Sequence, residues 1–233
     1  MVKTLYLIRH GETVGGDEKR YKGSIDVPLS EKGIEQIKKT AKFLSSIPLS
    51  AIYTSPLSRA LKSAEIIAEG HGLNPIIIPE LRERSFGIWE GMTFLEIKEK
   101  YPVEFENWAN NPLKYSPPQG ESTIQVRDRV IKALDEILNK SHHASRITHH
   151  GLLSELQTNI VIVAHGGVNR VILCHVMGIP LENIFRIEQD NSAINIIEFW
   201  DKYPVLHPKK SNDFLGTPVV RLLNGTWNME YGI

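Results

Sequence analysis

The stretch Asn159-Ile160-Val161-Ile162-Val163-Ala164-His165-Gly166-Gly167 indicates the class of fold. Five apolar residues follow Asn159 without interruption, and four of them are β-branched. A short apolar run of this kind, ended by a histidine and two glycines, is typical of a buried strand. Apolar residues then recur at helical spacing over residues 168–176, which predicts an amphipathic helix directly after the strand. A strand followed at once by a helix is the repeating unit of a parallel α/β sheet.

The same alternation of strands and helices extends over the rest of the chain. Further strands are expected at residues 4–8, 51–54, 76–78, 193–200 and 217–223. Residues 92–120 are expected to form a mostly helical excursion that ends in a loop rich in proline and glycine.

Capping residues predict where three of the helices begin. Ser30 is expected to cap a helix whose apolar face ends at Leu44. Ser55 is expected to be the N-cap of the next helix, with Pro56 at its first position. A capping box that starts at Ser122 predicts a third helix, with an apolar stripe from Val126 to Leu138.

Composition excludes several classes of protein. The 233 residues include 27 basic and 27 acidic side chains, so the formal net charge is zero and gives no general attraction to nucleic acid. No apolar run approaches the roughly 20 residues that cross a bilayer, and the N-terminal residues do not match a signal peptide. Cys174 is the single cysteine, so no internal disulfide forms. We expect a cytoplasmic protein with no membrane or nucleic-acid partner.

These patterns predict an α/β fold with a doubly wound, mostly parallel sheet and helices on both faces. We expect a single domain over residues 1–233, with surface insertions near 141–158 and 203–216. The sequence is compatible with a homodimer. In an open sheet of this kind the ligand site lies beyond the carboxyl ends of the strands.

Basic and histidine side chains stand where several of these strands end. Arg9 and His10 follow the first strand, Arg59 lies just after the second, and His165 follows the strand at 159–164. Two arginines, two histidines and free helix N-termini would together bind a dianion such as a phosphate group. The guanidinium fork of arginine suits this role because it bonds two phosphate oxygens and keeps its charge.

A histidine among arginines has its pKa lowered and remains a neutral nucleophile. Attack on phosphorus would give a phosphohistidine, and the departing alkoxide would need a proton from a carboxylic acid. Glu83 is the leading candidate for this acid. Glu12, Glu80 and Glu90 are its rivals, and an ion pair of Glu83 with Arg82 or Arg84 is the alternative structural role.

Five ordered motifs resemble those of the histidine phosphatase superfamily, which includes cofactor-dependent phosphoglycerate mutases and many phosphatases. The motifs lie at residues 9–13, 54–60, 81–83, 120–122 and 164–167. The resemblance implies that His10 is the phosphorylated nucleophile and Glu83 the proton donor. It also implies a phosphate pocket made of Arg9, Thr13, Gly23, Arg59, His165 and Gly166.

The sequence departs from the family pattern in two places. The family often has asparagine where this chain has Gly16, which removes one phosphate contact. Lys22 stands where glutamine is frequent, and its charge would replace the lost contact as a further phosphate ligand. These changes bear on specificity more than on family membership.

Three functions fit the resemblance. The first is a phosphatase for small phosphorylated metabolites, with α-ribazole 5'-phosphate as one candidate substrate. The second is a phosphoglycerate mutase that depends on 2,3-bisphosphoglycerate, and the third is a non-catalytic binder of phosphorylated ligands. The segments at residues 87–91, 101–108 and 118–122 resemble the phosphatase branch, which favours the first.

No cofactor and no metal are expected. The four histidines His142, His143, His149 and His150 do not have the spacing of a zinc motif, and no cysteine or carboxylate cluster accompanies them. We therefore expect a solvated insertion there rather than a metal site.

Overall fold

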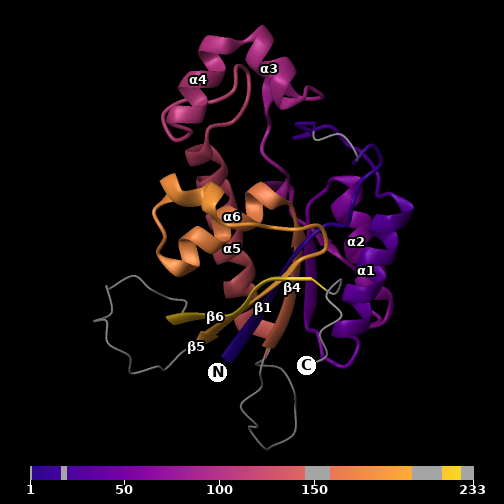
Figure 1. Ribbon diagram of the computed structural model, residues 1–233. Helices are drawn as coiled ribbons and strands as arrows, with labels where there is room; N and C mark the ends of the chain where they lie inside the picture. Colours follow the sequence, from indigo (N-terminus) through magenta and orange to yellow (C-terminus); the bar gives the residue numbers. More distant parts are fainter. Residues whose placement is uncertain (1, 17–19, 145–157, 201–216, 227–233) are drawn as a thin grey trace, which may run out of the picture.

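The computed structural model describes residues 2–16, 20–144, 158–200 and 217–226 (Figure 1). Its strands are β1 (Val2–Arg9), β2 (Ala51–Thr54), β3 (Ile76–Ile77), β4 (Thr158–Ala164), β5 (Ile194–Trp200) and β6 (Thr217–Gly225). Its α-helices are α1 (Glu31–Leu44), α2 (Ser58–Glu69), α3 (Phe94–Lys100), α4 (Pro102–Asn110), α5 (Thr123–Ala144) and α6 (Gly166–Met177). Short 3₁₀ helices are η1 (Pro79–Leu81), η2 (Gly87–Trp89) and η3 (Leu181–Arg186).

The six strands form one sheet in the order β3-β2-β4-β1-β5-β6. The four strands from β3 to β1 are parallel, whereas β5 pairs antiparallel with both β1 and β6. This confirms the mostly parallel sheet that the sequence predicts. Residues of β4 are all buried, as expected for a strand with helices on both faces.

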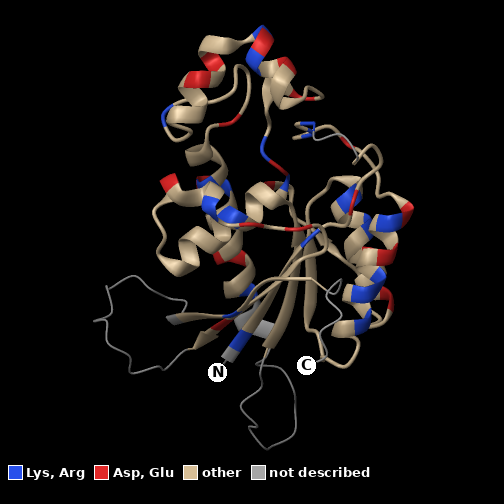
Figure 2. Ribbon diagram, viewed as in Figure 1, with Lys and Arg blue, Asp and Glu red and all other residues tan. Residues whose placement is uncertain are grey.

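Successive side chains of β1 point to opposite faces of the sheet, and each face carries its own hydrophobic core. Leu5 and Leu7 pack with the apolar faces of α5 and α6 on one side of the sheet. Tyr6 and Ile8 pack with α1 and α2 on the other side. Figure 2 shows acidic and basic residues mixed along α1 and α2, on the outside of the molecule, while β2 and β4 carry none. The doubly wound arrangement is therefore confirmed.

Two of the three predicted helix caps are present. Ser30 accepts a hydrogen bond from Gly33 N at the start of α1. Ser122 and Gln125 exchange hydrogen bonds at the start of α5, as a capping box does.

The prediction that Ser55 caps the second helix is wrong. Helix α2 begins at Ser58, and its first amide donates to the Asp26 carboxylate over 2.8 Å. Asp26 reaches the helix from a loop 32 residues earlier in the chain, and so it takes the role that the local sequence assigns to Ser55. The Ser55 hydroxyl instead accepts from Leu57 N, one residue before α2 begins.

The segment between η2 and α5 forms a separate lobe beyond the sheet, at the top of Figure 1. Helices α3 and α4 lie in it and enclose a small aromatic core around Trp89, Phe105 and Trp108. This confirms the helical excursion expected at residues 92–120. The lobe stands over the carboxyl ends of the parallel strands, where a ligand site is expected.

Helix α5 runs to Ala144, and so His142 and His143 belong to a helix. Residues 145–157 and 201–216, with His149 and His150, lie outside the described part of the chain. The two surface insertions therefore stay predictions.

Candidate active site

Parallel pairing of β1, β2 and β4 brings three distant segments together. Arg9 pairs with Ala164 in the ladder, and the amide of His10 donates to Ala164 O over 3.0 Å. The amide of Ser55 donates to Val163 O over 3.2 Å. As a result the rings of His10 and His165 lie with centroids 5.1 Å apart and an interplanar angle of 64°.

Backbone contact fixes the protonation state of His10. Its Nδ1 lies 2.7 Å from the carbonyl oxygen of Gly11. A carbonyl oxygen can only accept, so Nδ1 carries a proton, and in the neutral ring Nε2 has the free lone pair. Burial, followed by the charges of Arg9 and Arg59, holds the pKa of His10 well below its ordinary value. The ring is therefore a neutral base at neutral pH.

His165 is fully buried, and its two nitrogens have different surroundings. Nε2 lies 2.8 Å from Oγ of Ser55. Nδ1 is buried without a hydrogen-bond partner among the described residues. Burial lowers the pKa of His165 well below its ordinary value, and the nearby His10, Arg59 and Arg9 lower it further. A buried nitrogen of this kind in a polar site is satisfied when a water or a ligand atom binds next to it.

Arg9 is held from behind by a loop and presents its Nε to the site. Its Nη1 donates to Gln189 O over 2.5 Å. Its Nε is buried and has no partner in the described ranges. Burial lowers the pKa of Arg9, and Glu83 partly opposes this effect. Gln189 is itself fixed by Asn195, whose amide donates to both Gln189 Oε1 and Leu7 O.

Arg59 and the loop at residues 23–25 hold one another. Arg59 Nη1 donates to Ile25 O and Nη2 to Gly23 O, each over 2.8 Å. Gly23 has φ +46°, and a Cβ there would lie 2.4 Å from Glu90 Oε1. The loop thus requires glycine at this position. Arg59 is close enough to both histidines to lower their pKa values.

Lys22 adds a further cation next to the predicted phosphate pocket. Its Nζ donates to Oγ1 of Thr13 and to Val14 O. Burial lowers the pKa of Lys22, and the charge of Arg59 lowers it further. A phosphate role for Lys22 in place of the asparagine absent at Gly16 stays a prediction.

Glu83 enters the site from the segment after η1. Its Oε1 accepts from Arg84 N over 2.9 Å, and its Oε2 accepts from Gly167 N over 3.1 Å. A Cβ on Gly167 would lie 2.5 Å from Glu83 Oε1, so a larger residue there would displace this carboxyl group. The backbone carbonyl of Glu83 is held by Arg129, which in turn pairs with Glu121 over 2.8 Å.

Two of the three rivals of Glu83 have other partners for their side chains. Glu12 pairs with Lys32 over 2.7 Å and contacts Ser30. Glu90 accepts from the amides of Ser24 and Phe86.

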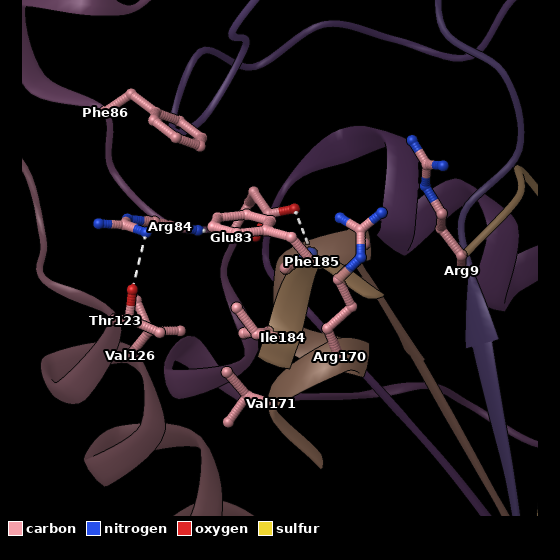
Figure 3. Close-up of a pocket in the computed structure, with 12 residues that line it drawn as sticks. Arg9, Glu83, Arg84, Phe86, Thr123, Val126, Arg170, Val171, Ile184 and Phe185 are labelled. Carbon is pink, nitrogen blue, oxygen red and sulfur yellow. Dashed lines mark hydrogen bonds between the residues drawn. The ribbon is translucent and has the colours of Figure 1, made fainter. Parts of the chain in front are cut away.

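A cavity of about 210 Å³ opens beside these groups (Figure 3). Arg9, Glu83 and Gly166 line one part of it. Arg84, Phe86, Arg170 and Phe185 line the rest, together with aliphatic side chains of α5, α6 and η3. Of the four acidic candidates, Glu83 alone lines this cavity.

The structure brings His10, Arg9, Arg59, Glu83 and His165 into one site, but sequence reasoning missed three of its neighbours. The local sequence predicts a helix cap at Ser55 and gives no sign of its contact with His165. The local sequence does not mark Arg84 or Arg170 as site residues, because an arginine on a helix or in a loop is most often exposed to solvent. Their place in the cavity depends on the packing of α5 and α6 around the segment of Glu83.

No cluster of three or more histidine, cysteine, aspartate or glutamate side chains in the described ranges could hold a metal ion. No helix within those ranges is long and apolar enough to cross a membrane.

Comparison with known proteins identifies the family. The model of the histidine phosphatase superfamily, branch 1, matches residues 5–211. Phosphoserine phosphatase 1 of Hydrogenobacter thermophilus is 32% identical over 206 residues, which cover 88% of this chain and 90% of the relative. The adenosylcobalamin/alpha-ribazole phosphatase of Escherichia coli is 27% identical over 202 residues, with 87% and 93% covered.

Solved structures agree with this assignment. The alpha-ribazole phosphatase from Shigella flexneri superposes with a TM-score of 0.78 at 26% identity, covering 95% of this chain and 96% of that one. The family match and these relatives together support a phosphomonoester hydrolase. The chain belongs to the histidine phosphatase superfamily, branch 1.

Proposed function

We propose that this chain hydrolyses small phosphomonoesters through a covalent phosphohistidine on His10. The main observation in support of this proposal is that the His10 ring is neutral, with its proton on Nδ1. Its Nδ1–H donates to Gly11 O, and its Nε2 is a free base in a ring whose pKa is lowered by burial and by the charges of Arg9 and Arg59. A neutral nitrogen nucleophile beside fixed cations is suited to attack the phosphorus of a dianion.

In the first step Nε2 of His10 attacks phosphorus, and the bond from phosphorus to the alcohol oxygen breaks. Arg9 Nε and His165 Nδ1, both buried and unpartnered among the described residues, donate to the phosphoryl oxygens. Arg59 supplies further positive charge. Glu83 gives its proton to the departing alkoxide, and so the alcohol leaves as a neutral molecule.

In the second step water attacks the phosphohistidine. Glu83, now ionised, accepts a proton from this water, and the bond from phosphorus to Nε2 breaks. Inorganic phosphate is released, and His10 returns to the neutral state in which it began.

The experiment is a comparison of His10→Ala with the matched control His175→Ala, which removes an exposed histidine of α6. Rapid mixing with a ³²P-labelled substrate should give an acid-labile, base-stable label on the wild type and on the control. His10→Ala should carry no label and should lose turnover. Turnover within tenfold of wild type in His10→Ala would contradict the mechanism.

Relatives named for phosphoserine and for α-ribazole phosphate support a small phosphorylated metabolite as substrate. A panel of phosphomonoesters that includes both compounds, phosphoglycerates and sugar phosphates would rank the candidates. Mutase activity that requires 2,3-bisphosphoglycerate would argue against a hydrolase.

A further inference from the structure

The cavity beside Glu83 holds the part of the substrate that leaves. This inference rests on the proposed function, in which Glu83 protonates the ester oxygen. That oxygen joins the phosphoryl group to the alcohol, so Glu83 marks the boundary between them. His10 and Arg59 lie on the phosphoryl side and do not line the cavity. The space beyond Glu83 is therefore the binding site for the alcohol.

Most of the wall on the alcohol side is apolar. Phe86 and Phe185 stand on it with aliphatic side chains of α5, α6 and η3. Beyond Arg9 and Glu83, the charged residues that line the cavity are Arg84 and Arg170. An apolar pocket with few polar groups uses those groups to select its ligand.

Arg84 makes most of its hydrogen bonds within the protein, and its Nη2 is buried without a partner among the described residues. Its Nε donates to Glu121 O and its Nη1 to Thr123 Oγ1. Its guanidinium carbon lies 5.5 Å from the ring centroid of Phe86 and 5.7 Å from that of Trp108. The lobe that carries α4 is thus held to the site by this arginine. Burial lowers the pKa of Arg84 to about 10.

Arg170 is held at one atom only. Its Nε donates to Ile187 O over 2.7 Å, which fixes the side chain on the wall of the cavity. Its two Nη atoms have no hydrogen-bond acceptor among the described residues. Figure 3 shows the guanidinium groups of Arg170 and Arg9 pointing to the same side of the cavity. A Cβ placed on Gly166 would lie 3.8 Å from Arg170 Nη1 and 3.5 Å from Arg9 Nε.

Arg170 therefore presents a free, pre-positioned fork of donors next to the phosphoryl site, on the side of the alcohol. We propose that the enzyme selects phosphomonoesters whose alcohol carries a carboxylate close to the ester oxygen, and that Arg170 binds this carboxylate. A carboxylate matches the planar fork of a guanidinium with two parallel hydrogen bonds. Of the arginines that line the cavity, Arg170 alone has both Nη atoms unpartnered among the described residues. Its single charge fits a carboxylate better than a second phosphate dianion.

A matched pair of substrates tests this proposal. 3-Phosphoglycerate and glycerol 3-phosphate share three carbons and the same phosphate ester, and they differ in a carboxylate against a hydroxymethyl group. The wild type should hydrolyse 3-phosphoglycerate with a kcat/KM roughly 10- to 100-fold higher, as expected for a charge-assisted pair. α-Ribazole 5'-phosphate, which has no carboxylate, should be a poorer substrate than O-phosphoserine.

The ratio of the two kcat/KM values is the readout for variants, because a general loss of folded enzyme lowers both values and leaves their ratio unchanged. Arg170→Gln should lower the ratio at least about tenfold. Arg170→Lys, which keeps the charge without the fork, should give an intermediate ratio. Arg127→Ala removes an exposed arginine of α5 paired with Asp128, and it should keep the wild-type ratio.

Three results would overturn the proposal. The first is a wild type that hydrolyses 3-phosphoglycerate and glycerol 3-phosphate equally well and still hydrolyses p-nitrophenyl phosphate in a reaction that requires His10. The proposed function would then hold, and the carboxylate site would be refuted. Another is an Arg170→Gln enzyme with an unchanged ratio. The third is a preference for glycerol 1,3-bisphosphate over 3-phosphoglycerate, which would assign the free fork to a second phosphate. A wild type inactive on every ester, p-nitrophenyl phosphate included, would refute the proposed function and this inference together.

Discussion

The hydroxyl of Ser55, at the end of β2, lies 2.8 Å from Nε2 of His165, at the end of β4. The same hydroxyl oxygen accepts a hydrogen bond from Leu57 N over 3.3 Å. We predict that Ser55 donates its own proton to His165, since Nε2 then accepts as an unprotonated ring nitrogen. His165 then carries its proton on Nδ1, the buried atom that has no partner in the described ranges. Ser55 thus sets His165 to donate toward the predicted phosphate site.

Ser55→Ala should reduce kcat about tenfold, because the ring would lose the hydrogen bond that selects its tautomer. ¹⁵N chemical shifts of His165 should show Nδ1–H alone in the wild type and a mixture of tautomers in the variant. Ser50→Ala, which removes a serine at the opposite end of β2, is the matched control and should change neither measurement. An unchanged tautomer in Ser55→Ala would show that other contacts orient the ring.

Glu83→Gln should separate substrates by their leaving groups. Loss of the acid should lower kcat for alkyl phosphates by about 10²- to 10⁴-fold, since an alkoxide leaves poorly without a proton. Hydrolysis of p-nitrophenyl phosphate should fall much less, because nitrophenolate leaves unaided. Thermal unfolding of the variant provides the control for folding. Equal losses on both substrates in a stably folded variant would assign the acid to another residue.

Chelation should leave the activity unchanged. The guanidinium groups of Arg9 and Arg59, with Nδ1–H of His165, already supply positive charge and donors for a phosphoryl dianion, so a metal ion has no charge left to neutralise. Prolonged dialysis against EDTA followed by assays with and without added divalent ions would check this. A large loss restored by one added ion would contradict the prediction.

Stability should decline below pH 6.5, which is the ordinary pKa of histidine. Above this pH, His10 and His165 are neutral in both the folded and the unfolded chain and contribute no dependence on pH. Below it, both histidines become protonated in the unfolded chain but stay neutral in the folded chain, because burial holds their folded pKa values low. The free energy of unfolding should therefore fall by up to about 1.4 kcal/mol per pH unit for each ring.

Denaturant titrations between pH 7.5 and pH 5, as rough limits, would measure this slope. His10→Gln removes one of the two rings and should make the slope shallower. An identical slope in this variant would show that other groups cause the acid dependence.

The sequence by itself determined the elements of the fold and the residue types of the site. Apolar runs such as 159–164 and the capping residues Ser30 and Ser122 act within a few residues, so their structural consequences can be predicted locally. Arg9, His10 and His165 stand at strand ends in the sequence itself, which indicates that they converge.

The tertiary structure alone decided which side chains meet. Ser55 and His165 are 110 residues apart, and their contact depends on the parallel register of β2 against β4. Asp26 replaces Ser55 as the cap of α2 from 32 residues away. Arg170 faces the cavity because its Nε is held by Ile187, beyond the end of its own helix. Such partners come from other elements, so their identity follows from packing and register and not from local sequence.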